Sequence, residues 1–236
     1  MKDTKDNFKS VTVVFCTRDT DDGTDRFIRH IAETSGCDTN IICIKNTDGI
    51  SISTVYADVI DTYEGIDDVV VFIHDDIEFL RSGWGEEVCR LFSENAEYGI
   101  IGVAGSAQFD EKGAWWNYPK RFGQVLHRDG GNSWLTAFSP LLDKDIQEVA
   151  VIDGLFMAVD RKRIADNFDR NIKSFDFYDI DFCLSNTLSG KCKVGVTTNI
   201  RLAHMSVGVP RESWYENREI INKKYGKHYP IDVNRR

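Results

Sequence analysis

The sequence predicts an α/β fold built on a mostly parallel mixed sheet with helices on its faces. Strand-like and helix-like stretches alternate through the first half of the chain, which is typical of parallel strands joined by crossover helices. The run Val-Val-Val-Phe-Ile at 69–73 is apolar throughout, as expected of a strand that is covered on both faces. With 236 residues, 42% of them hydrophobic, the chain can bury a sizeable core, and we expect a single domain over residues 1–236.

The elements of the first half follow from the positions of the apolar residues. In the segment 84–95, Val88, Leu91 and Phe92 share one face of a helix. This half is Rossmann-like in pattern, with strands predicted at 11–16, 40–45, 69–73 and 100–104 and helices predicted at 25–34, 53–62 and 84–95.

The second half is less regular. Residues 107–146 are rich in aromatic, glycine and charged residues without a clear period, so we expect a long loop that is functional or partly disordered. After this loop we predict strands at 149–152, 155–159 and 193–198, a helix at 179–188 that Gly190 ends, and a last helix at 213–224.

Composition excludes several classes of partner. The net charge is −9 and no long basic stretch is present, so we expect no nucleic-acid partner. The longest apolar runs have the length of strands, so we expect no membrane span. The six cysteines are scattered without a CxxC pair, which favours a reducing, cytoplasmic location.

An acidic segment directly follows the predicted strand at 69–73. His74, Asp75, Asp76 and Glu78 would therefore lie at the carboxyl edge of the sheet, where open α/β sheets bind ligands. Carboxylate oxygens suit Mg²⁺ or Mn²⁺, and such an ion could bridge two phosphates. A solvated acidic turn explains the same residues, so the pattern leaves both interpretations open.

A second acidic cluster precedes the predicted helix at 179–188. Asp179 and Asp181 are two residues apart and cannot share a helix face, so one could act as a general base while the other caps the helix. Capping alone is the other interpretation. His204 follows a strand and a short connection, and it is either a structural residue or a further metal ligand. Asp153 and Gly154 form a predicted tight turn between two apolar runs.

Aromatic residues in the 107–146 segment offer a third kind of site. Trp115 and Trp116 could stack on sugar rings or bases, or they could pack in the core. The sequence contains no GxxxxGK[ST], GxGxxG, GxSxG or HExxH pattern, which disfavours P-loop and nucleophilic mechanisms.

Together these motifs resemble family-2-type glycosyltransferases, in particular the compact bacterial glycosyltransferase-like group. The resemblance runs from about residue 11 to about residue 214 and depends on the order of its segments, which are 16–19, 46–49, 70–76, 101–106, 151–156, 175–181 and 204–208. It implies the GT-A (nucleotide-diphospho-sugar transferase) fold, with a nucleotide-binding half at 1–106 and an acceptor and catalytic half at 107–236.

The resemblance also implies roles for single residues. Asp179 matches the catalytic base, and Asp76 and His204 match ligands of a divalent metal, Mg²⁺ or Mn²⁺. The acceptor side would include Asp153, Trp115 and Trp116. The nucleotide would contact Thr17, Arg18, Asp19, Asn46, Asp48 and Asp75.

Two positions depart from the family pattern. His74 stands where the DxD motif has its first acid, and Tyr178 stands where the Glu-Asp pair has its first acid. Membrane helices and the QxxRW-type motif of processive synthases are not found, so the resemblance favours a single addition.

The expected function is inverting, metal-dependent transfer of a sugar from a nucleotide-diphosphate donor to a sugar or glycolipid acceptor, in polysaccharide or glycoconjugate synthesis. A catalytically inactive binding module of the same fold is the first alternative. A nucleotidyltransferase is the second, and the acidic segment at 18–23 argues against it, because such enzymes carry a basic, glycine-rich loop there.

Overall fold

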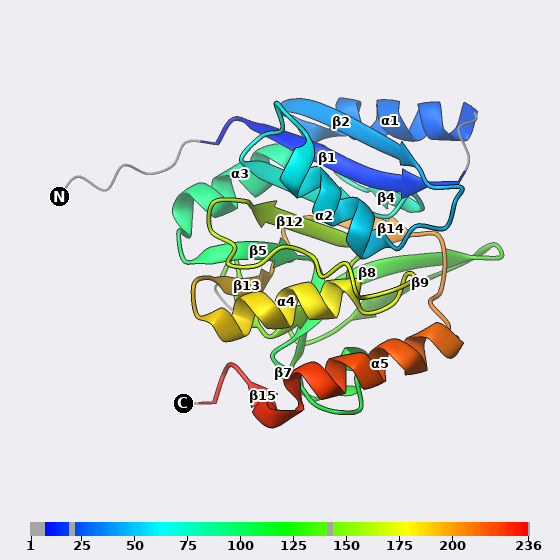
Figure 1. Ribbon diagram of the computed structural model, residues 1–236. Coiled ribbons are helices and arrows are strands. Elements are labelled where there is room, and N and C mark those ends of the chain that lie inside the picture. The colour runs from blue at the N-terminus through cyan, green and yellow to red at the C-terminus, as the bar shows by residue number, and fades with distance from the viewer. Residues whose placement is uncertain (1–7, 19–21, 141–143, 236) are drawn as a thin grey trace.

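The computed structural model describes residues 8–18, 22–140 and 144–235. Its centre is a seven-stranded sheet in the order β10-β13-β5-β12-β3-β1-β2 (Figure 1). Strands β12 and β10 run antiparallel to the others, which confirms the predicted mixed and mostly parallel sheet. The strands are β1 (Ser10–Thr17), β2 (Asp38–Lys45), β3 (Val69–Ile73), β5 (Tyr98–Gly102), β10 (Gln147–Val149), β12 (Phe156–Asp160) and β13 (Lys193–Val196).

Helices cover both faces of this sheet (Figure 1). Helices α1 (Asp22–Ser35) and α3 (Trp84–Glu94) contact each other on one face. Helices α2 (Ile52–Thr62) and α4 (Tyr178–Ser189) lie on the other face, where the rings of Tyr56 and Tyr178 are 5.8 Å apart. Helix α5 (Glu212–Tyr225) comes near the end of the chain. None of the described helices has the length and apolar character that crossing a bilayer requires.

A second sheet packs beside the first, and the sequence did not predict it. Its order is β11-β6-β8-β14-β4, with β9 paired to β8. The strands are β4 (Ile77–Phe79), β6 (Ala104–Ser106), β8 (Arg121–Asp129), β9 (Asn132–Ala137), β11 (Val151–Ile152) and β14 (Leu202–His204). A further short pair joins β7 (Gln108–Phe109) to β15 (Ile231–Asp232).

The prediction of one long loop at 107–146 is therefore wrong for much of that segment. Strands β8 and β9 form a hairpin whose turn contains Gly130 and Gly131, both with positive φ, a conformation that glycine adopts without steric cost. The sequence of β9 does not show the alternation of apolar and polar residues that predicts a strand. This strand is largely exposed, and it still carries the apolar residues Trp134 and Leu135. The predicted strand at 149–152 is also divided, between β10 in the first sheet and β11 in the second.

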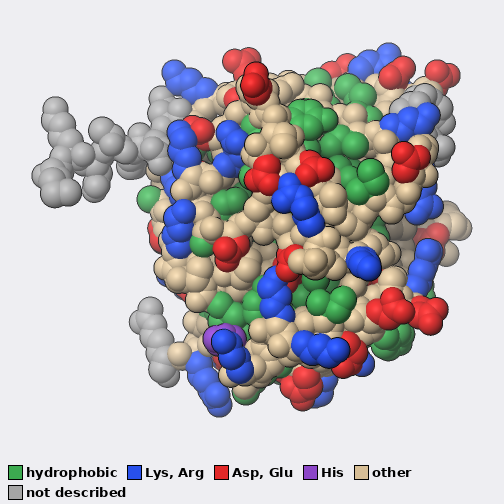
Figure 2. Space-filling model, viewed as in Figure 1, with side chains coloured by type: hydrophobic (Ala, Val, Ile, Leu, Met, Phe, Trp, Pro, Cys, Tyr) green, Lys and Arg blue, Asp and Glu red, His purple; other side chains and the backbone are tan. Residues whose placement is uncertain are grey.

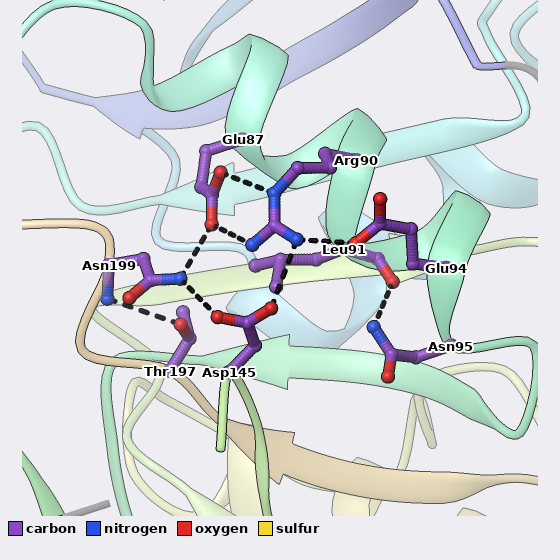
Figure 3. A network of polar contacts seen from close by, with 8 residues as sticks. All are labelled: Glu87, Arg90, Leu91, Glu94, Asn95, Asp145, Thr197 and Asn199. Carbon is purple, nitrogen blue, oxygen red and sulfur yellow. Dashed lines mark hydrogen bonds and ion pairs between the residues drawn. The ribbon is translucent and has the colours of Figure 1, made fainter. Parts of the chain in front are cut away.

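A polar network on the surface connects three separate segments (Figure 3). Arg90 on α3 binds Glu87 and Glu94 of its own helix and Asp145, which precedes β10. Asn199, which follows β13, donates to Glu87 at 2.7 Å and to Asp145 at 3.0 Å. Such a network holds the connection between β13 and β14 against α3, and it therefore helps to place the end of β14.

The surface carries charges of both signs. On the face shown in Figure 2, acidic and basic side chains are interspersed and hydrophobic side chains show between them. No long basic stripe crosses this face, as expected from a sequence with a net charge of −9.

Candidate active site

Three candidate metal ligands meet where β3 ends and β4 pairs with β14. His74 directly follows β3, and the antiparallel register of His204 with Ile77 brings the end of β14 beside Asp76. The backbone N–H of Met205 donates to the carbonyl of Asp76 at 2.8 Å. The distance from Asp76 Oδ1 to His204 Nε2 is 3.3 Å and to His74 Nδ1 is 3.9 Å. One ligand atom from each residue lies within 4.8 Å of the other two.

The charges in this cluster favour an ionised Asp76. Burial raises the pKa of Asp76, but the hydrogen bond and the charge of His204 outweigh burial and lower this pKa to about 2. Burial acts to lower the pKa of His204, and Asp76 reverses the effect, so that the net shift is upward. Burial lowers the pKa of His74, although Asp153 and Asp76 oppose the shift. The result is one carboxylate between two imidazoles.

This donor set fits a divalent transition ion. Imidazole nitrogens are ligands that Mg²⁺ rarely takes, whereas Mn²⁺ accepts both nitrogen and carboxylate oxygen. His74, Asp76 and His204 could therefore hold Mn²⁺ more readily than Mg²⁺.

Two further carboxylates meet at the turn between β11 and β12. Asp179, in the first turn of α4, accepts from the backbone N–H groups of Gly154 and Ile180, both at 2.8 Å. Asp153 accepts from the backbone N–H of Leu155 at 3.0 Å. Burial raises the pKa of Asp179, the charge of Asp153 adds to the shift, and the pKa reaches about 7. A carboxyl with a pKa near neutrality suits general base catalysis.

Asp181 does not cap the helix, contrary to one of the two roles considered for this pair. The residue at the start of α4 is Phe177, which has a φ of 64° and makes no side-chain capping bond. Asp181 is instead buried and bonded to Lys224 and Tyr225 of α5, at 2.8 and 2.9 Å. It anchors α5 to α4, whereas Asp179 faces a cavity.

Both groups of side chains line one cavity of about 560 Å³. A pocket of this size can hold a nucleotide or a sugar. Its polar lining includes His74, Asp75, Asp76, Asp153, Asp179 and His204, and its aromatic lining includes Trp115, Trp116, Phe175, Phe177 and Trp214.

A comparison with known proteins shows which family the chain belongs to. The model of a glycosyltransferase-like family matches residues 12–225. The chain belongs to this glycosyltransferase-like family. No curated protein matches the sequence. Membership of this family supports glycosyl transfer.

Among the solved structures that resemble this glycosyltransferase-like chain are two sugar-transferring enzymes. The structure of GalNAc-T7 with UDP, GalNAc and Mn²⁺ has a TM-score of 0.61 at 8% identity, over 92% of this chain and 48% of that chain, so this chain spans about half its length. The catalytic domain of Drosophila β1,4-galactosyltransferase 7 with xylobiose has a TM-score of 0.54 at 10% identity, over 89% of this chain and 80% of that chain. These likenesses show the predicted GT-A fold.

The predicted acceptor-side tryptophans of the glycosyltransferase-like chain differ in exposure. Trp115 is 5% exposed, packed against Trp116 and Phe138, whereas Trp116 is 36% exposed. The ring of Trp214, from α5, lies 6.2 Å from Trp116 and 5.1 Å from Phe177. Trp116 and Trp214 therefore form an aromatic wall on one side of the cavity.

Most of the predicted nucleotide contacts lie beside the cavity and not on it. Asn46 donates its backbone N–H to the carbonyl of Thr17 at 2.9 Å, and its side chain closes a turn onto the backbone of Ile50. Arg18 and Asp48 are exposed at the same edge of the sheet. Within this group, Asp75 lines the cavity. Asp19 lies outside the described residues.

Besides Trp214, two further site residues were not among those predicted. His127 on β8 is in parallel register with His204, their rings are 6.1 Å apart, and it lines the cavity. Tyr178 contacts His74 directly, with 3.0 Å between the hydroxyl oxygen and Nε2. Nothing in the sequence pointed to His127, because its strand lies within the segment that was predicted to be a loop. The sequence did draw attention to Tyr178, because this residue departs from the pattern that the resemblance implies.

Proposed function

We propose that this chain is a metal-dependent, inverting glycosyltransferase that moves a sugar from a nucleoside-diphosphate donor to an acceptor hydroxyl. One observation carries the proposal. The partly buried carboxyl of Asp179, with a pKa of about 7, lines the same cavity as the cluster of His74, Asp76 and His204. This reaction needs a general base and a bound metal ion, and candidates for the base and for the metal ligands line the same cavity.

His74, Asp76 and His204 are the residues that would hold the metal. A divalent ion bound there supplies positive charge that stabilises the departing diphosphate. The protein has a net charge of −9, and Asp75 adds an exposed carboxylate at the cavity, so a diphosphate without a cation would be repelled. The Mn²⁺ in the GalNAc-T7 structure supports the same assignment.

Asp179 is the proposed base. Its two hydrogen bonds from the backbone N–H groups of Gly154 and Ile180 fix the orientation of its carboxylate. It takes the proton of the acceptor hydroxyl while that oxygen forms a bond to the anomeric carbon, and the bond from this carbon to the phosphate oxygen breaks with its electrons passing to the nucleoside diphosphate. Burial keeps the pKa of Asp179 high, the charge of Asp153 adds to this shift, and Asp153 offers an acceptor for a second substrate hydroxyl.

The acceptor is proposed to be a sugar or glycolipid whose ring lies against the aromatic wall of Trp116 and Trp214. With such an acceptor, the proposed role of the chain is in polysaccharide or glycoconjugate synthesis. All six cysteines are free, which supports the proposed cytoplasmic location.

A transfer screen tests the proposal. The purified chain is incubated with Mn²⁺, a panel of UDP-, GDP- and dTDP-sugars and simple sugar acceptors, and the release of nucleoside diphosphate is measured. Asp179→Asn should lower turnover by at least about 100-fold while donor binding, measured by calorimetry, persists. Asp129→Asn makes the same change at an exposed carboxyl in the β8–β9 hairpin and should leave turnover unchanged.

The alternative of an inactive binding module is favoured by one observation, the replacement of two family acids by His74 and Tyr178. It predicts that donor sugars bind but are not consumed on long incubation. Turnover in Asp179→Asn equal to that of the unmodified chain would reject Asp179 as the base.

A further inference from the structure

The two departures from the family pattern contact each other. His74 and Tyr178 are 104 positions apart in the chain, yet His74 Nε2 lies 3.0 Å from the hydroxyl oxygen of Tyr178. The same hydroxyl lies 3.0 Å from the carbonyl oxygen of Gly154. Each residue stands where the resemblance to the family implies an acid, so the two departures form one local arrangement.

The protons in this arrangement can be assigned from what each group can donate. A carbonyl oxygen only accepts, so the hydrogen bond between Tyr178 and Gly154 uses the single hydroxyl proton of Tyr178. The contact with His74 then needs a proton from the imidazole. Both hydrogen bonds are therefore satisfied only when His74 carries its proton on Nε2.

The other ring nitrogen of neutral His74 is consequently left with a lone pair. This atom, Nδ1, faces Oδ1 of Asp76 at 3.9 Å, which is too long for a hydrogen bond. Two acceptor atoms that face each other without a proton between them repel, unless a cation lies between them. The nearby Nε2 of His204 completes a group of three ligand atoms.

The surroundings hold Tyr178 in this position. Tyr178 is 2% exposed, and its ring packs against Tyr56 and Phe175. Gly154 makes the approach possible, because a Cβ at this position would lie 2.2 Å from the hydroxyl oxygen of Tyr178. The ring of His74 in turn packs against Phe175, with 5.0 Å between their centres.

We propose that Tyr178 is a positioning residue that fixes His74 in the Nε2–H tautomer and so presents Nδ1 as the third ligand of a divalent metal. Metal-bound histidines commonly donate their second N–H to such a partner, which sets the tautomer and the ring orientation. The inference rests on the proposed metal site but not on turnover. It explains how two missing acids can leave the site able to bind a metal.

Binding of Mn²⁺ alone tests this role without any sugar nucleotide. The ion is titrated into the full chain and free Mn²⁺ is measured by electron paramagnetic resonance. Tyr178→Phe should bind Mn²⁺ about 10- to 100-fold more weakly. Tyr225→Phe is the matched control, because it removes another buried hydroxyl, which donates to Asp181 and does not line the cavity, and its affinity for Mn²⁺ should be unchanged.

A double-mutant comparison shows whether Tyr178 acts through His74. In the background of His74→Ala, adding Tyr178→Phe should change Mn²⁺ affinity by less than about twofold. An equal loss in both backgrounds would mean that Tyr178 acts on the fold and not on His74, which overturns the inference.

A second readout uses the metal-free chain. Nitrogen-15 NMR of the imidazole ring of His74 should show protonated Nε2 and bare Nδ1, and Tyr178→Phe should shift the ring toward a mixture of tautomers. Protonated Nδ1 in the unmodified chain refutes the proposal. Equal Mn²⁺ affinity of Tyr178→Phe and the unmodified chain refutes only the role of Tyr178, whereas no Mn²⁺ binding by the unmodified chain refutes the metal site as well.

Discussion

Replacing Asp179 by asparagine should change how the stability of the protein depends on pH. The carboxyl has a pKa of about 7 in the folded chain, against an ordinary value of 3.8, because it is partly buried and because Asp153 lies nearby. The titratable groups that interact with it are Asp153 from the turn before β12 and Tyr178 and Cys183 from α4. Asparagine has a similar shape and does not titrate.

The sign and size of the effect follow from linkage. Because the folded-state pKa is raised, the stabilising contribution of protonated Asp179 is complete below about pH 4 and is lost as the pH rises through about 7. The full loss of stability is about 4 kcal/mol, and about 3 kcal/mol of this loss occurs between about pH 5 and about pH 8. The NH₂ group of asparagine would also face one of the two backbone N–H groups that now donate to the carboxylate. This lost hydrogen bond lowers the free energy of unfolding by about 1 to 3 kcal/mol at every pH.

The assay is urea unfolding of both proteins from about pH 5 to about pH 8, followed by tryptophan fluorescence. The difference in free energy of unfolding, variant minus unmodified chain, should rise by about 3 kcal/mol across this range. Asp153→Asn is the control. It removes the neighbouring charge that helps to raise the pKa of Asp179. The free energy of unfolding of Asp153→Asn should therefore depend less strongly on pH than that of the unmodified chain. Parallel stability curves for Asp179→Asn and the unmodified chain would refute a raised pKa.

Further predictions concern the metal, the pH dependence of transfer, the acceptor, the glycine at the site and the buried ion pair. Turnover should reach half its maximum at a lower concentration of Mn²⁺ than of Mg²⁺, because two of the three candidate ligands are imidazoles. The release of nucleoside diphosphate is measured while each metal is titrated, and equal half-maximal concentrations contradict this prediction. Transfer should rise with pH through about 7, as Asp179 loses its proton, and a rate that falls over this range contradicts its role as base. Trp116→Ala should raise KM for the acceptor with little change in kcat, measured by initial rates, if stacking contributes equally before and during reaction. Gly154→Ala should displace Tyr178, lower Tm and weaken Mn²⁺ binding, whereas unchanged binding contradicts the packing argument. Lys224→Met should destabilise the chain by about 2 kcal/mol in urea unfolding, because Asp181 stays buried without its cation, and Asp181→Asn in the same background should recover part of the loss.

The sequence alone determined most strands of the first sheet, the order of the motifs and the family. The first-half strands and helices are long enough for their apolar periods to stand out, so β1, α1, β2, α2, β3, α3 and β5 were all predicted within a few residues. The family match over residues 12–225 confirms the resemblance that those ordered motifs indicated. The roles of Asp76, Asp179 and His204 remain predictions, now supported by their place on one cavity.

The tertiary structure decided the second sheet and the contacts within the site. Strands β4, β6, β11 and β14 have two or three residues each, too few for a period to appear, and they exist because distant segments pair. Register across β14, β4 and β8 is what places His204 beside Asp76 and near His127. The sequence showed His74 and Tyr178 as separate departures from the family pattern. Only folding, which brings the end of β3 against the start of α4, shows that they share a hydrogen bond.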